Sequence, residues 1–178
     1  MEEFELIQRI KSGEKYLFEH LIKRCEDFVY SICINSLKDS EDAKDIAQDK
    51  FYKAYKSIKS YDGAKSKFST WIYRIAYNKC IDFIRKKNSF LNYKNYIKTK
   101  TETHTKQEHI FQSEIVNKLL SKLTAEESAM ITLYYFDDMS VKEISYITKQ
   151  SESYVKVKLH RIRKKLKNIA EKEYNNEL

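Results

Sequence analysis

The sequence SVKEISYITKQSESYVKVKLHRIRKKLK, from Ser140 to Lys167, contains two helical patterns separated by a short polar break. Ser140 and Glu143 have the spacing of a capping box, which begins a helix, and apolar residues follow at helical spacing. The pattern stops at residues 149–151, where Ser151 is available to cap a second helix. The stretch therefore predicts a helix, a tight turn and a second helix.

The second of these helices combines an apolar stripe with a strongly basic surface. Val155, Leu159 and Ile162 recur at i, i+4 and i+7, so this side packs inward. From Ser153 to Lys167 the chain has seven Lys or Arg residues and no acidic residue. A lone basic run is equally compatible with a solvated surface. Because the second helix of a helix-turn-helix enters the major groove, the pair of helices favours DNA contact.

The overall composition is typical of a helix-rich protein of one or two small domains. The 178 residues are 42% hydrophobic and 34% charged, with no proline and only two glycines. We therefore predict an all-α fold. No apolar run approaches membrane-spanning length and the N-terminus lacks a signal-peptide pattern, so we expect a cytoplasmic protein. Cys25, Cys33 and Cys80 lack metal-ligand spacing, which favours buried free thiols.

Charge is unevenly distributed along the chain, whose formal net charge is +8. Residues 1–50 have 8 basic and 12 acidic side chains, whereas residues 51–87 have 10 basic and 2 acidic ones. Residues 88–178 add 16 basic and 12 acidic side chains. One acidic section thus precedes two basic sections that suit nucleic acid.

The acidic section contains three predicted helices. Two helices separated near Ser12-Gly13 fit the apolar clusters up to Ile34. A third begins after Asp39-Ser40 and runs to about Lys59. Its apolar face opposes an acidic face, which consists of Asp42, Asp45 and Asp49. This acidic stripe is either an ordinary solvated face or a dock for a basic protein partner.

A loop from Ser60 to Lys67 and a helix from Phe68 to about Lys87 form the first basic section. Arg74, Asn78 and Arg85 are expected on the side opposite the apolar stripe. Six aromatic residues are interleaved with the cations: Tyr55, Tyr61, Phe68, Trp71, Tyr73 and Tyr77. Proteins that bind single-stranded nucleic acid stack bases on such rings. Part of these six residues is nevertheless expected in the core.

The remaining chain predicts a polar linker followed by a second helical domain. Apolar periodicity fades from about Asn88 to Gln112 and then resumes in a four-helix pattern that ends near Lys172. Thr124 and Glu127 form another capping box. We therefore predict domains at residues 1–88 and 113–178, joined by a linker at residues 89–112.

Together these segments resemble a bacterial RNA polymerase sigma factor of the extracytoplasmic-function (ECF) type, within the primary-sigma superfamily. The resemblance covers nearly the whole chain. It rests on DAKDIAQDKF at 42–51, FSTWIYRIAYN at 68–78, DFIRKK at 82–87, MSVKEI at 139–144 and SYVKVKLHRIRKKL at 153–166. It implies a region 2 helical bundle at residues 1–88 and a region 4 helix-turn-helix domain at residues 113–178.

The resemblance also implies three binding surfaces on a factor that binds core RNA polymerase, directs it to promoters and assists melting. The clamp helices of the largest polymerase subunit would bind Asp42, Asp45, Gln48 and Asp49. The minus-ten element would meet Tyr61, Lys65, Lys67, Phe68, Trp71, Arg74, Asn78 and Arg85. The minus-thirty-five element would meet Ser153, Lys156, Lys158, Arg161, Arg163 and Lys164.

The length of the predicted linker is compatible with binding at two sites. About 25 residues reach roughly 80 Å when extended, whereas two elements about two helical turns apart are separated by roughly 70 Å. The chain departs from the family pattern at Lys149, where the turn often has Gly, and at Gln150, where an apolar residue is usual. Lys44 and Lys50 also interrupt a helix face that is commonly acidic or apolar. These departures affect individual contacts more than the function.

Two alternatives to a sigma factor follow from the sequence. A polymerase-independent helix-turn-helix regulator would use residues 140–167 to bind duplex DNA, but it would need neither an acidic dock nor a strand-opening surface. An enzyme is disfavoured, because the sequence has no nucleophile–base pair, phosphate-binding glycine loop or metal-ligand cluster. We therefore expect no catalytic residue, cofactor or metal. An anti-sigma factor is a further partner that the resemblance allows.

Overall fold

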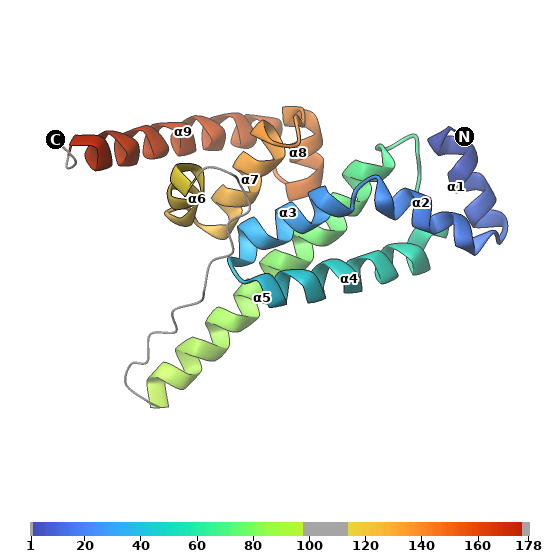
Figure 1. Ribbon diagram of the computed structural model, residues 1–178, viewed down its shortest axis with the longest axis horizontal. Helices are drawn as coiled ribbons and strands as arrows, with labels where there is room; N and C mark the ends of the chain where they lie inside the picture. The colour runs from blue at the N-terminus through green and yellow to red at the C-terminus, as the bar shows by residue number, and fades with distance from the viewer. Residues whose placement is uncertain (1, 98–113, 176–178) are drawn as a thin grey trace.

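The computed structural model describes residues 2–97 and 114–175, with side chains described for residues 2–89 and 115–172. Throughout these ranges the regular structure is helical, as predicted (Figure 1). The α-helices are α1 (Glu3–Ser12), α2 (Phe18–Lys23), α3 (Glu26–Leu37), α4 (Ser40–Ser57), α5 (Phe68–Ile97), α6 (Glu114–Ser121), α7 (Ala125–Tyr135), α8 (Val141–Thr148) and α9 (Glu152–Asn175). Short 3-10 helices occupy Lys15–Leu17 and Ile58–Ser60.

The first helix ends where the sequence predicts. Gly13 follows α1 with a φ of 123°, a left-handed conformation that glycine adopts without a Cβ clash. The single helix expected between Gly13 and Ile34 was a wrong prediction, because the chain bends at Cys25 and forms α2 and α3. Neither Gly nor Pro marks this bend, so periodicity alone does not reveal it.

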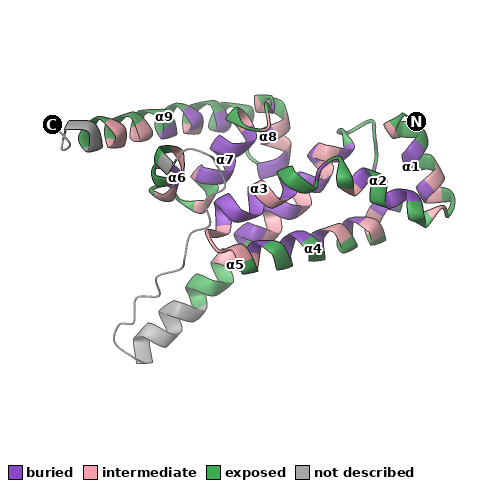
Figure 2. Cartoon of the chain, viewed as in Figure 1, coloured by how far each residue is buried: buried purple, intermediate pink, exposed green. Residues whose placement is uncertain are grey.

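Helix α4 begins and ends close to the predicted positions. The Asp39 side chain accepts hydrogen bonds from the backbone N–H groups of Glu41 (3.1 Å) and Asp42 (3.0 Å). These bonds satisfy donors that have no partner within the helix. Helix α4 packs against α3 and α5, which places one α4 face in the core and leaves the opposite face in solvent (Figure 2).

Helix α5 begins at Phe68, as predicted, but it is longer than the apolar pattern indicates. It continues to Ile97, whereas the sequence predicted an end near Lys87. Residues 89–97, which were expected in the linker, are therefore helical. The rest of the predicted linker, residues 98–112, lies outside the described residues.

Residues 114–175, the described part of the C-terminal half, form four helices, as predicted. Both capping boxes form, with reciprocal bonds between Thr124 and Glu127 and between Ser140 and Glu143. The backbone N–H of Tyr154 donates to the Ser151 hydroxyl at 3.2 Å, which caps the start of α9. The helix-turn-helix predicted from residues 140–167 is therefore present as α8 and α9.

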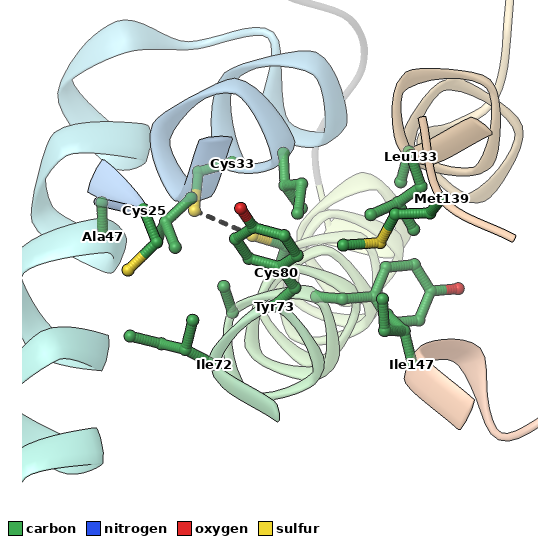
Figure 3. Packing of buried hydrophobic residues seen from close by; sticks show 14 of the residues in the cluster. Cys25, Cys33, Ala47, Ile72, Tyr73, Cys80, Leu133, Met139 and Ile147 are labelled. Atoms are coloured by element: carbon green, nitrogen blue, oxygen red, sulfur yellow. Dashed lines mark hydrogen bonds between the residues drawn. The ribbon is translucent and has the colours of Figure 1, made fainter. Parts of the chain in front are cut away.

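The two halves of the chain meet in a shared apolar core. Helix α3 packs against α7, and α5 packs against α8. Figure 3 shows the Tyr73 side chain of α5 between Cys33 of α3 on one side and Leu133 and Met139 of the C-terminal half on the other. All four side chains are buried. The sequence treated the halves as separate, so it did not predict that C-terminal helices cover part of α5.

The three cysteines are buried free thiols, which confirms that prediction. The sulfur atoms of Cys33 and Cys80 are 3.5 Å apart between α3 and α5 (Figure 3). Burial raises the pKa of the Cys25 thiol to about 12. A thiol with a raised pKa stays protonated and unreactive at neutral pH, so Cys25 acts as a core residue.

Candidate protein and nucleic-acid interfaces

The acidic face of α4 is largely open to solvent. Asp45, Gln48 and Asp49 are exposed, whereas Asp42 is half-buried and accepts a hydrogen bond from the Lys87 ammonium of α5 at 2.9 Å. All four side chains predicted to bind polymerase thus lie along one helix. The exposed carboxylates give this face a negative charge without contributing to the core.

Lys50 explains how a cation is accommodated beside this acidic face. Its side chain is only 4% exposed, and its ammonium donates a hydrogen bond to the Asp49 carboxylate. This hydrogen bond lowers the pKa of Asp49. A buried ammonium needs such a partner, because removing it from water without one is strongly unfavourable. Lys50 therefore faces inward and does not interrupt the exposed acidic stripe.

Three aromatic side chains fix the loop between α4 and α5. The ring centroids of Tyr61 and Phe68 are 5.7 Å apart, and those of Tyr61 and Trp71 are 5.4 Å apart. The Tyr61 hydroxyl donates to the Ser66 carbonyl at 2.8 Å, which closes the loop on itself. Tyr61 and Phe68 are buried and Trp71 is half-buried. The first two rings thus shape the loop in this conformation, and their predicted contact with DNA remains untested.

The polar residues predicted to meet minus-ten DNA lie on the loop and along α5. Lys65 and Lys67 are well exposed, at 73% and 75% of their side-chain surface. Arg74 and Asn78 are half-buried, and the Asn78 side-chain amide donates to the Arg74 carbonyl. Arg85 is exposed. Lys67, just before α5, and Thr70, Arg74, Asn78 and Arg85 on α5 follow one another at helical spacing, and we call these five residues the α5 strip. Three of them are basic, and the buried Thr70 contributes a hydroxyl.

The residues predicted to meet minus-thirty-five DNA lie on α9, and most are exposed. Exposed members are Ser153, Lys156, Arg161, Arg163 and Lys164. Lys158 is the exception, because its ammonium is 3.3 Å from a carboxylate oxygen of Glu127. Val155, Leu159 and Ile162 are buried beneath this surface, as the periodicity predicted. The helix therefore presents a row of cations while its other side is held by the core.

Family comparisons match both halves of the chain. Residues 21–90 match Sigma-70 region 2, and residues 113–166 match Sigma-70, region 4. Together these matches cover well over half of the chain. The chain belongs to the sigma-70 family. It is an RNA polymerase sigma factor of the ECF type, as its similarity to curated relatives also indicates.

Two of these relatives of the sigma factor come from Bacillus subtilis (strain 168). The ECF RNA polymerase sigma factor SigW is 32% identical, over 90% of this chain and 92% of SigW. The ECF RNA polymerase sigma factor SigM is also 32% identical, over 84% of this chain and 92% of SigM.

Solved structures show the same fold at lower sequence identity. The sigma factor RpoE of Bartonella quintana, in complex with the anti-sigma factor NepR, has a TM-score of 0.71 and 19% identity, over 86% of this chain and 96% of RpoE. CnrH, in complex with the cytosolic domain of CnrY, has a TM-score of 0.68 and 22% identity, over 93% of this chain and 95% of CnrH.

Some side chains of the sigma factor contact residues of another helix, and these contacts were not predicted from the sequence. Glu127 was predicted as a cap, but it also accepts from Lys165 at 2.7 Å and from Lys158. Burial opposes ionisation of Glu127, yet hydrogen bonds from Lys165, the Thr124 backbone and Lys158 hold its pKa to about 2. Tyr146 was not singled out at all, although its ring lies 4.4 Å from the Arg74 guanidinium. No local pattern signals a partner from another helix.

Within residues 2–97 and 114–175 no three His, Cys, Asp or Glu side chains lie together as metal ligands. In the same ranges no helix is both long and apolar enough to cross a bilayer.

Proposed function

We propose that this sigma factor binds core RNA polymerase through α4 and contacts promoter DNA through two separate basic surfaces. Residues 1–88 would form the domain for polymerase and minus-ten DNA, residues 89–112 the linker, and residues 113–178 the minus-thirty-five domain. The observation that carries the proposal is the separation of charge: exposed carboxylates outnumber the one exposed lysine in the N-terminal half of α4, whereas exposed cations predominate on the α4–α5 loop and α9. One protein partner of positive charge and one nucleic acid fit these faces.

The polymerase contact is assigned to Asp42, Asp45, Gln48 and Asp49. The clamp helices of the largest subunit are the partner that the family implies. Three of the four side chains are exposed on one side of a helix whose other side is buried. A helix holds these side chains in place more rigidly than a loop does. Less conformational entropy is therefore lost when the partner binds.

The minus-ten contact is assigned to the α4–α5 loop and the α5 strip. Lys65 and Lys67 are well exposed and would meet phosphates, and Trp71 and Arg74 would offer an aromatic ring and a guanidinium plane on which an unstacked base can lie. Capture of such bases would favour strand separation, because a base held in a pocket is removed from the duplex.

The minus-thirty-five contact is assigned to α9. Side chains near its N-terminus would reach base edges in the major groove, and Arg161, Arg163 and Lys164 would meet phosphates along the helix. Its role is to position polymerase, so it makes and breaks no covalent bond. Two structural relatives are described in complexes with other proteins, an anti-sigma factor in one case, which supports proposing an anti-sigma partner here. As a polymerase subunit, the protein would act in the cytoplasm.

Transcription with purified core polymerase tests the proposal. The Asp45→Lys, Gln48→Lys double variant should lose core binding in a pull-down by about tenfold or more, because one attractive charge becomes repulsive and a second positive charge is added. This variant keeps Asp49 as the partner of the buried Lys50 ammonium. The Glu152→Lys, Glu171→Lys double variant adds at least as much positive charge away from α4 and should bind core as the wild type does. Wild-type core affinity in the α4 variant would remove the assigned role of this face. Promoter binding without polymerase, with no initiation when core is added, would instead favour a polymerase-independent regulator.

A further inference from the structure

Helix α8 of the C-terminal half lies directly on the α5 strip. A carboxylate oxygen of Glu143 is 3.5 Å from the Lys67 ammonium and 3.4 Å from the Thr70 hydroxyl. One turn further along α8, the Tyr146 ring lies 4.4 Å from the Arg74 guanidinium. Three successive positions of the strip are therefore in contact with two side chains of α8.

The chemistry of these contacts matches that of single-stranded DNA. A carboxylate that accepts from an ammonium and a hydroxyl offers the same charge and the same acceptors as a phosphate oxygen. An aromatic ring on a guanidinium offers the same stacking surface as an unstacked base. Glu143 and Tyr146 thus present one phosphate-like and one base-like group in succession.

The C-terminal half also approaches the strip beyond the Tyr146 contact. Arg85 lies 3.9 Å from the Glu126 carboxylate of α7, and the Tyr77 ring is buried. A cleft of about 320 Å³ is lined there by Asn78 and Arg85 from α5 and by Lys149 and Gln150 from the turn after α8. The two ends of the strip, Lys67 and Arg85, remain exposed, whereas its middle members Thr70, Arg74 and Asn78 are buried or half-buried. The middle of the strip is therefore the part that a nucleic acid cannot reach in this conformation.

We propose that α8 is an intramolecular plug of the α5 strip, in which Glu143 and Tyr146 occupy the places of a phosphate and a base. The inference rests on the proposed binding of minus-ten DNA by this strip. In the free protein α8 covers the middle of the α5 strip, so single-stranded DNA cannot bind there. DNA reaches the strip only after α8 has moved off α5. The exposed cations of α9 stay open in the closed form, so the plug blocks one DNA surface and leaves the other free.

The contacts at the edge of the plug are suited to displacement. Lys67 is 75% exposed even while it faces Glu143, so water and salt screen this ion pair and its net contribution is small. A strand that supplies several phosphates at once can therefore compete with a single carboxylate. The Tyr146 contact is the more sheltered one, because both Tyr146 and Arg74 are half-buried.

Binding of a single strand to the full chain tests the plug. The probe is fluorescein-labelled oligo(dT) of fifteen nucleotides, followed by fluorescence anisotropy at low salt. Tyr146→Ala removes the ring without changing charge, and Glu143→Gln removes the charge but keeps the capping box. Each variant should bind the probe about threefold more tightly and the double variant about tenfold, because the closed state competes less for the strip. Glu171→Gln removes the same charge from the same half and should bind as the wild type does.

Arg74→Ala separates failure of the plug from failure of the proposed function. When Arg74→Ala is added to the double variant, the increase in probe affinity should disappear. That result would show that the additional affinity comes from binding of the probe to α5. If the double variant binds like the wild type while Arg74→Ala weakens the wild type, the plug is wrong and the minus-ten surface stands. If Arg74→Ala changes binding in neither background, the assignment of this surface fails and the plug fails with it.

Discussion

At the scale of single residues, Lys149 shows how the turn of the helix-turn-helix closes without glycine. Its φ is 58° in the left-handed region, and its backbone N–H donates to the Ser145 carbonyl. The family pattern often has Gly at this position, whereas this chain has Lys. The turn nevertheless forms, because Lys149 adopts the conformation that glycine would take more easily.

Replacing Lys149 by glycine should therefore stabilise the protein. The left-handed conformation is unfavourable for a residue with a Cβ, so Lys149→Gly should raise the free energy of unfolding by about 0.5–1 kcal/mol. Urea denaturation measures this change. Lys142→Gly, at an exposed position inside α8, should lower the same quantity by about 1 kcal/mol. Equal destabilisation by both substitutions would contradict the conformational argument.

Asp137, in the turn between α7 and α8, has both carboxylate oxygens buried with no hydrogen-bond partner among the described residues. Burial raises its pKa from 3.8 to about 7. Glu3, Arg24, Lys67 and Glu143 line the same cleft between the two halves. Between about pH 4 and pH 7, Asp137 therefore holds a proton in the folded protein but has released it in the unfolded chain.

This proton predicts a pH dependence with a definite sign. Between pH 4 and pH 7 the folded state binds more protons than the unfolded state at this site, so stability falls as pH rises. Asp137→Asn should remove this slope and raise the free energy of unfolding at pH 8 by about 1 kcal/mol, because a neutral amide is easier to bury. Denaturation curves recorded between pH 4 and pH 8 give the free energy of unfolding of both proteins as a function of pH. An unchanged slope in the variant would assign the pH dependence to other groups.

At the scale of elements, the sequence was most informative where a helix end depends on its own residues. The caps at Asp39, Thr124 and Ser140 follow from side chains two or three positions from the groups that they bond. The extension of α5 to Ile97 was missed for a physical reason. Apolar periodicity reports burial, and residues 85–89 are exposed, so the helix continues where the pattern has faded.

Glu127 joins α7 to α9 and gives an element-scale prediction. Its pKa of about 2 means that its ionised form stabilises the folded state above about pH 4.5, and that this contribution is lost as pH falls toward 2. Glu127→Gln keeps the cap but removes both ion pairs, so it should lower the free energy of unfolding by about 1 kcal/mol at pH 7.

The effect of Glu127→Gln should shrink as the buffer approaches pH 2, because Glu127 of the wild type then takes up a proton and loses its charge, as the glutamine of the variant has none. Glu171→Gln is the matched control, since Glu171 pairs with Lys167 on an exposed surface and should contribute little. Thermal unfolding followed by circular dichroism at several pH values compares the three proteins. A Glu127 effect that persists at low pH would point to packing instead of charge.

At the scale of the whole molecule, the sequence predicted two helical modules but not their contact. Tyr73 and Tyr77 have the same local pattern as residues that stack on bases, and the sequence left that choice open. Both are buried because α7 and α8 cover α5. The acidic and basic faces could be predicted because each lies on one helix, whereas contacts such as Arg74 with Tyr146 require the tertiary structure.

Lys38 also ties the two halves together. It follows the last residue of α3, and its ammonium donates to the carbonyls of Ser121, at the end of α6, and of Leu123, both at 2.7 Å. Burial lowers the pKa of Lys38. A shared core and this clamp predict that the wild-type protein unfolds in a single cooperative transition.

Lys38→Met should uncouple the halves. It removes both hydrogen bonds and leaves two carbonyls without a donor, so the contact between α3 and α6 should weaken by about 2 kcal/mol. The calorimetric transition should then broaden or split, because each half can unfold at its own temperature. Lys122→Met makes the same chemical change at an exposed residue between the two carbonyls and should unfold as the wild type does. If Lys38→Met keeps one sharp transition at the wild-type temperature, the shared core alone holds the halves together.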